Sequence, residues 1–166
     1  FAHQIADALP GAGCDTQRGG WYDMMERTLK DGEENYRRVW HDRKAWWQQE
    51  QGILAYYIMA GVYDDKPEYL SDAREGSAFY NGWFLDYEEG GIYFNVLANG
   101  QPYSLGSERG KGSHSMAGYH SFELCFLSAV YTNLLVNKQP MDFFFKPSPH
   151  AWPENKLRVA PDILPE

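Results

Sequence analysis

The segment Asp15-Thr-Gln-Arg-Gly-Gly-Trp-Tyr22 recurs 71 residues further along the chain as Asp86-Tyr-Glu-Glu-Gly-Gly-Ile-Tyr93. Both copies read Asp-x-x-x-Gly-Gly, followed by a large apolar residue and a tyrosine. Two adjacent glycines at such a place are typical of a tight hairpin. Each copy follows a predicted helix and precedes an aromatic-rich element, which favours an array of helix, hairpin and helix whose units pack on their neighbours. Two unrelated Gly-Gly turns are the alternative, because this dipeptide is common in hairpins.

Four segments have the apolar spacing of helices and predict a mainly α-helical fold. They cover about residues 2–9, 43–60, 67–85 and 120–135. The first should end at Pro10-Gly11 and the second at Gly61. The last has apolar residues at most positions, which predicts a largely buried helix. Between the third and fourth, residues 92–102 form an extended run that contains an Asn99-Gly100 turn.

Composition indicates the kind of ligand to expect. The chain has 166 residues, a formal net charge of −8 and an aromatic content of 16%. The acidic charge disfavours nucleic acid, because binding to a phosphate backbone depends on lysine and arginine. Aromatic rings stack on the apolar face of a sugar, so we expect a saccharide ligand. Rings used only as core filler are the alternative.

Several other classes of site are not predicted. Cys14 and Cys125 stand far apart without a CxxC motif, so we expect two small buried residues rather than a disulfide framework or a zinc site. The five histidines are scattered, and no phosphate-binding loop follows a strand, so neither a metal nor a nucleotide is expected. No apolar run of about 18 residues predicts a membrane span. With no basic leader at Phe1, we expect a cytoplasmic protein.

The C-terminal part of the chain differs in composition from the rest. Residues 138–166 are rich in proline, which predicts an irregular tail after a domain formed by residues 1–137. Four helices are too few to close a ring of paired helices, so an apolar flank should be covered by other residues. We therefore expect the chain to be a fragment at both ends.

Motifs within residues 1–137 resemble those of the N-acylglucosamine 2-epimerase and cellobiose 2-epimerase superfamily. They are Gly19-Gly20-Trp21-Tyr22-Asp23, Lys44-Ala45-Trp46-Trp47-Gln48-Gln49-Glu50, Phe84-Leu-Asp86 with Gly90-Gly91, and Lys111-Gly112 leading to Tyr119-His120. Each motif is weak alone, but their order and spacing are fairly specific. The resemblance implies part of an (α/α)6 toroid, or barrel, with short β-hairpins between its C-terminal helices and with the N-terminal half of the barrel missing from this chain.

What the superfamily implies is proton transfer at the carbon next to a sugar aldehyde. Such an enzyme is a cofactor-independent epimerase or isomerase of a mono- or disaccharide, neutral or N-acylated. A homodimer is compatible with the sequence. Two titratable groups are needed beside the reacting carbon, and imidazole suits both tasks because its pKa lies near neutral pH.

His120 matches the superfamily histidine that follows a tyrosine near the start of a late helix, which implies a catalytic role. The implied sugar-binding residues are Trp46, Trp47, Glu50, His114 and Tyr119. Trp46 and Trp47 lie about 100° apart on a helix, so one should pack in the core while the other contacts sugar. The partner histidine, in a Gly-His-x-x-Glu motif, should precede Phe1. The isolated chain is therefore expected to be inactive.

Four positions depart from the superfamily pattern. Gln51 stands where a glutamate is usual, and Glu123 where an arginine is common three residues after the histidine. Ser115-Met116 replaces a frequent Trp-Lys. These changes leave open a non-catalytic carbohydrate-binding protein on the same scaffold.

A third class is an α/α-toroid glycosidase or lyase. Asp86 and Glu88 resemble the paired carboxylates of a glycosidase, although solvated charge is usual beside a Gly-Gly turn. A lyase would use Tyr119 and His120 for β-elimination, which the acidic net charge disfavours.

Overall fold

The computed structural model describes residues 1–112, 115–116 and 118–146. Its helices are α1 (Ala2–Gly13), α2 (Trp46–Val62), α3 (Pro67–Trp83) and α4 (Tyr119–Tyr131), with a short 3-10 helix η1 (Gly106–Glu108) and a π-helical turn η2 (Thr132–Val136). The strands are β1 (Arg43–Ala45) and β2 (Asn95–Leu97). The prediction of a mainly helical fold is confirmed.

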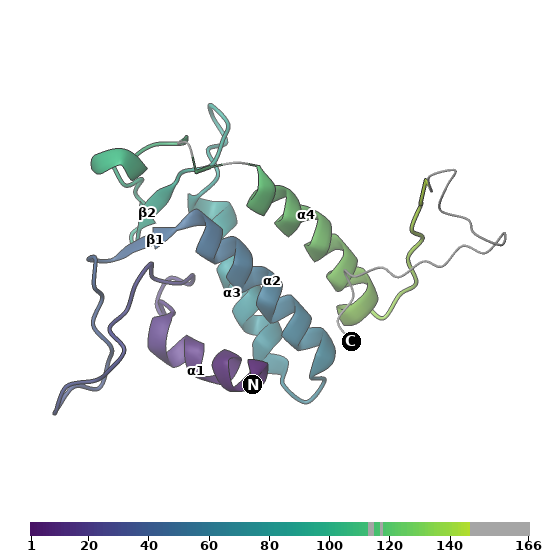
Figure 1. Ribbon diagram of the computed structural model, residues 1–166, viewed down its shortest axis with the longest axis horizontal. Helices are drawn as coiled ribbons and strands as arrows, with labels where there is room; N and C mark the ends of the chain where they lie inside the picture. Colours follow the sequence, from purple (N-terminus) through teal and green to yellow (C-terminus); the bar gives the residue numbers. More distant parts are fainter. Residues whose placement is uncertain (113–114, 117, 147–166) are drawn as a thin grey trace, which may run out of the picture.

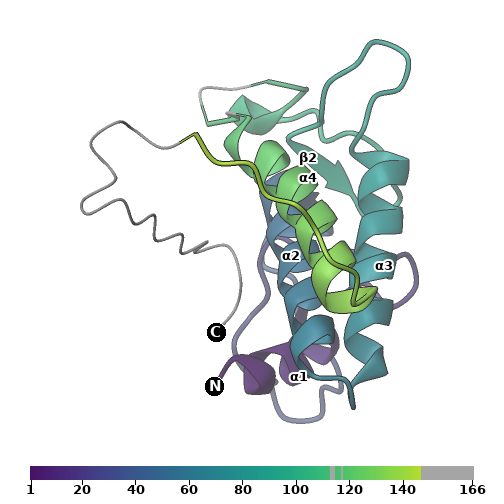
Figure 2. The ribbon, with the colours of Figure 1, turned by 90° about the vertical axis from the view of Figure 1, so that its right-hand side faces the viewer.

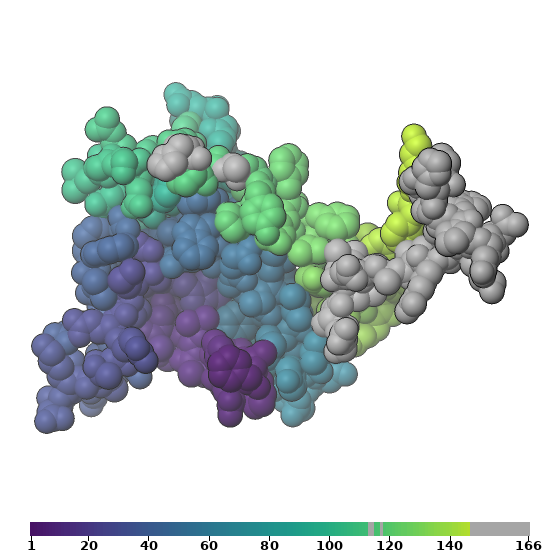
Figure 3. All heavy atoms as spheres, viewed as in Figure 1, coloured from purple at the N-terminus to yellow at the C-terminus, as the bar shows by residue number. Residues whose placement is uncertain are grey.

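Helix α2 is the central element, because it contacts both α3 and α4. The short connection of residues 63–66 turns the chain back so that α3 runs beside α2, while α4 follows another face of α2 (Figures 1 and 2). Helix α1 packs beside this group, where the Tyr56 hydroxyl donates to the carbonyl oxygen of Ala6 at 2.9 Å. The connection from residue 23 to residue 42 projects away from the body (Figures 1 and 3).

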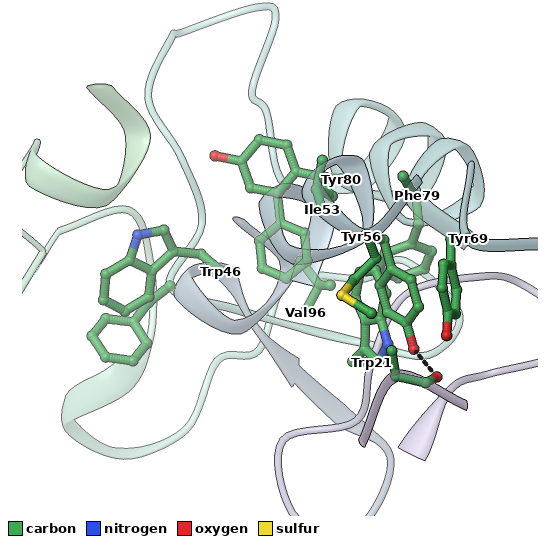
Figure 4. Close-up of a cluster of buried hydrophobic side chains, with 13 residues drawn as sticks. Trp21, Trp46, Ile53, Tyr56, Tyr69, Phe79, Tyr80 and Val96 are labelled. Atoms are coloured by element: carbon green, nitrogen blue, oxygen red, sulfur yellow. Dashed lines mark hydrogen bonds between the residues drawn. The ribbon is translucent and has the colours of Figure 1, made fainter. Parts of the chain in front are cut away.

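The main core lies between α2 and α3 and is built around Trp21 (Figure 4). The Trp21 ring stacks on Tyr56 with centroids 5.7 Å apart. It fits because two glycines face it: a Cβ atom added to Gly52 would lie 2.9 Å from the ring, and one added to Gly76 would lie 2.4 Å from it. Gly52 and Gly76 thus leave space for a tryptophan supplied by the first hairpin.

Strands β1 and β2 are antiparallel, with Lys44 opposite Val96. The ladder continues into the first helical turn, since the Trp46 backbone N–H donates to the Phe94 carbonyl oxygen at 3.0 Å. The sheet therefore fixes the start of α2 against the segment that follows the second hairpin. Residues 43–45 were expected to be helical and are extended instead, because their backbone groups pair with β2.

The two copies of the repeat have the same local structure, so the expected internal repeat is confirmed. In the first, Asp15 Oδ1 accepts from the N–H groups of Gln17 and Arg18, and Lys44 Nζ binds Asp15 Oδ2 at 2.9 Å and the Gly19 carbonyl at 2.6 Å. The second copy repeats each bond.

In the second copy of the repeat, Asp86 Oδ1 accepts from the N–H groups of Glu88 and Glu89. Lys111 Nζ binds Asp86 Oδ2 at 2.7 Å and the Gly90 carbonyl at 3.0 Å. The two glycines of each copy, Gly19-Gly20 and Gly90-Gly91, have φ between 76° and 91°, a region that residues with a side chain disfavour.

The hairpins differ in what covers them. Helix α3 covers the first, where a Cβ on Gly19 would lie 3.0 Å from the Glu75 carbonyl oxygen. A Cβ added to the equivalent Gly90 would meet nothing within 4 Å among the described residues. Lys44 is accordingly fully buried, whereas 26% of the Lys111 side chain is exposed.

Two expected helix ends were wrong. Helix α1 continues through Pro10 to Gly13, and the Pro10 carbonyl oxygen still accepts from the Cys14 backbone N–H at 3.4 Å. Helix α2 continues past Gly61 to Val62. A Cβ on Gly61 would lie 2.2 Å from Leu135 Cβ, so this glycine serves close packing of α2 on η2 rather than termination.

The prediction that residues 120–135 form a largely buried helix was also wrong. In α4 only Val130 and Tyr131 are buried, while Phe122 is 77% and Phe126 is 54% exposed. The expectation that both cysteines are buried was wrong, because Cys125 lies exposed on the same helix and Cys14 is only partly buried. The cause is that α4 packs on α2 with one face and no described residue covers its other face.

Candidate functional site

His120 lies in the first turn of α4, where that helix meets the beginning of α2. Three aromatic rings surround it. The ring centroids of Trp46, Trp47 and Tyr119 are 6.1, 6.2 and 4.8 Å from that of the half-buried imidazole. Two of these rings come from residues more than 70 positions earlier in the sequence and the third from the residue next to His120, and together they build an aromatic wall around one titratable group.

The Trp-Trp pair provides two different surfaces. Trp46 is buried and packs on Phe94 with ring centroids 4.6 Å apart. Trp47 is 41% exposed. The prediction that the two rings point differently, one of them into the core, is confirmed. Trp47 is thus the ring of the pair that is accessible to solvent.

A polar pair joins the two helices beside the imidazole. Gln51 Nε2 donates to Glu123 Oε2 at 2.8 Å and lies 3.3 Å from His120 Nδ1. Glu123 also accepts from the Tyr119 hydroxyl at 3.3 Å. The two departures from the superfamily pattern, Gln51 and Glu123, are therefore hydrogen-bond partners of each other and lie at the site.

Glu50 is fully buried beneath the site. Its Oε1 accepts from the Tyr80 hydroxyl at 2.5 Å and from Ser121 Oγ at 2.7 Å, whereas Oε2 has no partner among the described residues. Burial raises the pKa of Glu50, although the bonds from Tyr80 and Ser121 act in the opposite direction. Glu50 lies on α2 and therefore links this helix to α3 through Tyr80 and to α4 through Ser121. Its carboxyl group does not reach solvent.

A groove of about 490 Å³ opens next to the exposed tryptophan. Trp47 and Gln51 line it on the α2 side, together with Trp21, Asp23 and Gln48. The lining combines two indole rings and these polar groups with the apolar side chains of Leu9, Ala12, Met25 and Ala55, so most of the groove surface is apolar.

Other predicted residues have the following positions. Tyr119 is 64% exposed beside His120. His114 lies outside the described residues. Asp86 is held by Lys111, whose ammonium group lowers the pKa of that carboxyl far below its usual value, and Glu88 contributes a backbone N–H to the same turn. These two carboxylates belong to a hairpin rather than to the His120 site.

The sequence did not indicate two residues of the site, Tyr80 and Ser121, or the hydrogen bond between Gln51 and Glu123. Glu123 follows His120 by three residues on a helix, a spacing that places two side chains on one face. This spacing could have indicated that Glu123 lies near His120, but not that Glu123 binds Gln51, which is 72 residues away. The partnership of Tyr80 and Ser121 with Glu50 had no signal, because it depends on how α3 and α4 pack on α2.

Across residues 1–112, 115–116 and 118–146, no three His, Cys, Asp or Glu side chains come close enough together to hold a metal ion. Within the same residues, every helix is too short or too polar to cross a bilayer.

No protein-family model matches the chain, and no curated protein matches it. Among solved structures, it is similar to the cellobiose 2-epimerase from Bacillus thermoamylovorans B4167, with 20% identity and a TM-score of 0.48 over 75% of this chain and 27% of that chain. It is also similar to the cellobiose 2-epimerase from Spirochaeta thermophila DSM 6192, with 17% identity and a TM-score of 0.43 over 62% of this chain and 25% of that one. The chain thus spans about a quarter of the length of either solved structure.

Proposed function

We propose that this chain is part of a carbohydrate epimerase or isomerase that moves a proton at the carbon next to a sugar aldehyde, with His120 as a proton-transfer residue. The unit that carries this function is the domain of residues 1–137, as part of an α/α toroid. The substrate is a mono- or disaccharide, and no cofactor takes part in the chemistry.

The observation that carries the proposal is the setting of His120. Imidazole is the side chain most often used to give or take a proton in catalysis. This imidazole lies among the rings of Trp46, Trp47 and Tyr119. A sugar stacked on the exposed face of Trp47 lies within reach of the imidazole, because the two rings are 6.2 Å apart.

Substrate binding is assigned to the groove beside Trp47. A pyranose stacks on the indole, and its hydroxyls meet the polar side chains of Gln48, Gln51 and Asp23 along the same wall. Glu50 acts indirectly, by holding the start of α4 through Ser121. The second titratable group that this chemistry requires is an imidazole or carboxylate outside the described residues.

A second candidate function is carbohydrate binding without catalysis. It is favoured by the Gln51–Glu123 hydrogen bond, because this neutral–acidic pair replaces the glutamate and arginine that the superfamily pattern has at these positions. A glycosidase has less support, because Asp86 is committed to Lys111 and to the backbone of its own turn.

The test uses the full-length protein in heavy water with neutral and N-acylated aldoses and with disaccharides. Proton NMR then follows the signal of the hydrogen on C2. An epimerase or isomerase replaces that hydrogen by deuterium. Saturable sugar binding without exchange supports the second candidate instead, and an unsaturated product that absorbs in the ultraviolet identifies a lyase.

A further inference from the structure

We propose that Gln51 holds His120 in the neutral tautomer that carries its proton on Nε2, so that His120 meets a bound sugar as a hydrogen-bond donor. Gln51 is then a positioning residue, and Glu123 fixes the orientation of Gln51. The inference rests on the proposed function for the identity of the sugar, but the tautomer itself is a property of the free protein.

The first step concerns the orientation of the Gln51 amide. Its nitrogen only donates hydrogen bonds and its oxygen only accepts them, while an ionised carboxylate only accepts. Because Gln51 Nε2 lies 2.8 Å from Glu123 Oε2, the NH₂ end of the amide faces α4. The reverse orientation would bring two acceptors together, at the cost of the hydrogen bond and with added repulsion. Glu123 thus decides which end of Gln51 meets the imidazole.

The second step concerns the ring of His120. The other hydrogen of the same NH₂ group is available to His120 Nδ1, 3.3 Å away. A ring nitrogen that accepts a hydrogen bond carries no proton, so the single proton of the neutral imidazole is on Nε2. An imidazolium would present an N–H group to the Gln51 NH₂ group, donor against donor. The contact therefore favours the neutral Nε2–H form over both alternatives.

Two carboxylates oppose this effect by favouring a charged ring. Glu123 on α4 and Glu50 on α2 both lie close to His120. Glu123 is occupied by Gln51 and by the Tyr119 hydroxyl, and the buried Glu50 is bound by Tyr80 and Ser121. From α2 the imidazole otherwise faces the rings of Trp46 and Trp47, which carry no charge.

The chemical consequence is a defined direction for the hydrogen bond to the substrate. An Nε2–H group can donate to the carbonyl oxygen of an aldehyde and polarise it, which makes the hydrogen on the adjacent carbon more acidic. Removal of that hydrogen requires a free lone pair, which Nε2 lacks in this tautomer. His120 thus serves as the proton donor of the two titratable groups, at a sugar oxygen, and the second group takes the carbon-bound proton; in this way His120 keeps the proton-transfer role of the proposed function.

The experiment measures the tautomer directly, without substrate. Long-range ¹H–¹⁵N NMR of the histidine rings distinguishes Nδ1–H, Nε2–H and imidazolium by their nitrogen shifts. Spectra of the full-length, ¹⁵N-labelled protein are recorded at about pH 8, above the usual histidine pKa of about 6.5. The His120 signals are those lost in the His120→Gln variant. We expect Nε2–H to exceed Nδ1–H roughly fivefold or more, as one net hydrogen bond predicts.

The deciding comparison is the exchanged pair Q51E/E123Q. It keeps a hydrogen bond between positions 51 and 123 but places a carboxylate oxygen, rather than an amide nitrogen, opposite Nδ1. The populations should then reverse in favour of Nδ1–H. A second variant, Glu123→Ala, frees the Gln51 amide to rotate, so the Nδ1–H signal should rise above its wild-type level.

An imidazolium or an Nδ1–H ring in the wild-type protein contradicts the inference. So does an unchanged tautomer in both variants. Circular dichroism confirms that the variants are folded. If sugar exchange is absent while the tautomer responds as expected, the proposed function fails and this inference stands. If sugar exchange is present but the His120 tautomer does not change in the variants, this inference fails and the proposed function stands.

Discussion

Trp46 and Trp47 are neighbours in the chain but lie on opposite sides of the boundary between core and solvent, with 3% and 41% of their surface exposed. Both rings nevertheless lie close to His120. One therefore supports the site from the core, and the other forms its open wall.

The different burial of Trp46 and Trp47 predicts different effects of substituting each by alanine. Trp46→Ala removes a buried ring and should lower the free energy of unfolding by about 3–5 kcal/mol. Trp47→Ala should change it by less than about 1 kcal/mol, since its ring is partly in solvent, and should weaken sugar binding instead. Urea unfolding measures the first effect and calorimetric titration with sugar the second. Equal losses of stability would contradict the assigned positions.

Two glycines of α3 make a matched pair. Gly76→Ala forces a methyl group to within 2.4 Å of the Trp21 ring, whereas a Cβ on Gly82 meets nothing within 4 Å among the described residues. We expect Gly76→Ala to cost at least about 1–3 kcal/mol through overpacking. Gly82→Ala should stabilise by up to about 1 kcal/mol, because alanine is the better helix former. Thermal unfolding of the two variants decides the comparison, and stabilisation by Gly76→Ala would refute the packing of Trp21.

The repeated hairpins predict unequal costs for one substitution. Burial alone would raise the pKa of Asp15, but the hydrogen bond and charge of Lys44 outweigh it and hold the pKa below its usual value. Asp15→Asn leaves the buried Lys44 without its counter-charge and should cost about 3–5 kcal/mol. Asp86→Asn should cost clearly less, because Lys111 is partly in solvent. Similar losses in urea unfolding would mean that the covering of the first hairpin by α3 has no energetic effect.

Asp86 also predicts a pH dependence. Lys111 lowers its pKa in the folded state. A carboxylate with a lowered folded pKa contributes stability above its unfolded pKa of about 3.9 and loses it as the pH falls through the folded value. The stability difference between wild type and Asp86→Asn should therefore be largest near pH 7 and shrink below about pH 4. A difference that is constant from pH 7 to pH 2.5 would exclude the Asp86–Lys111 bond.

Glu50 predicts the reverse trend, because burial raises its pKa. A group with a raised folded pKa contributes stability below its unfolded pKa, about 4.3 for glutamate, and loses it as the pH rises through the folded value. The neutral Glu50→Gln variant should therefore gain stability relative to wild type between about pH 4 and pH 8. Denaturation midpoints across this range provide the measurement. A relative loss at high pH would show that Glu50 is stabilised in its charged form.

Sequence patterns predicted the helices better than their surroundings. Apolar periodicity identified all four α-helices, and the Asp-x-x-x-Gly-Gly repeat predicted two like hairpins. The glycines show the limit of such rules. Gly61 was expected to end a helix, and a glycine inside a helix, such as Gly76, ordinarily weakens it. Each of them instead leaves room for a side chain from another segment, Leu135 at Gly61 and Trp21 at Gly76. Close approach of distant segments has no local signature.

In the candidate site, too, motifs indicated individual residues, whereas contacts between distant segments had no signal in the sequence. His120 and the Trp-Trp pair could be chosen from motifs, and the 100° rule separated the two indoles. The contact of Gln51 with Glu123 could not be predicted, because 72 residues separate them and the contact depends on how α4 packs along α2. Likewise, the apolar sequence of α4 predicted burial, whereas exposure depends on which partner each face has.

The most direct test of the proposed function compares deuterium exchange at sugar C2 between the full-length wild-type protein and its His120→Asn variant in heavy water. His41→Asn, which alters an exposed histidine that stacks on Tyr103 and does not line the groove beside Trp47, is the matched control. The account predicts exchange by wild type and control, and at least a 100-fold slower exchange in His120→Asn, with an unchanged unfolding midpoint. Wild-type rates in the His120→Asn variant, or no exchange with any tested sugar in the wild-type protein, would contradict it.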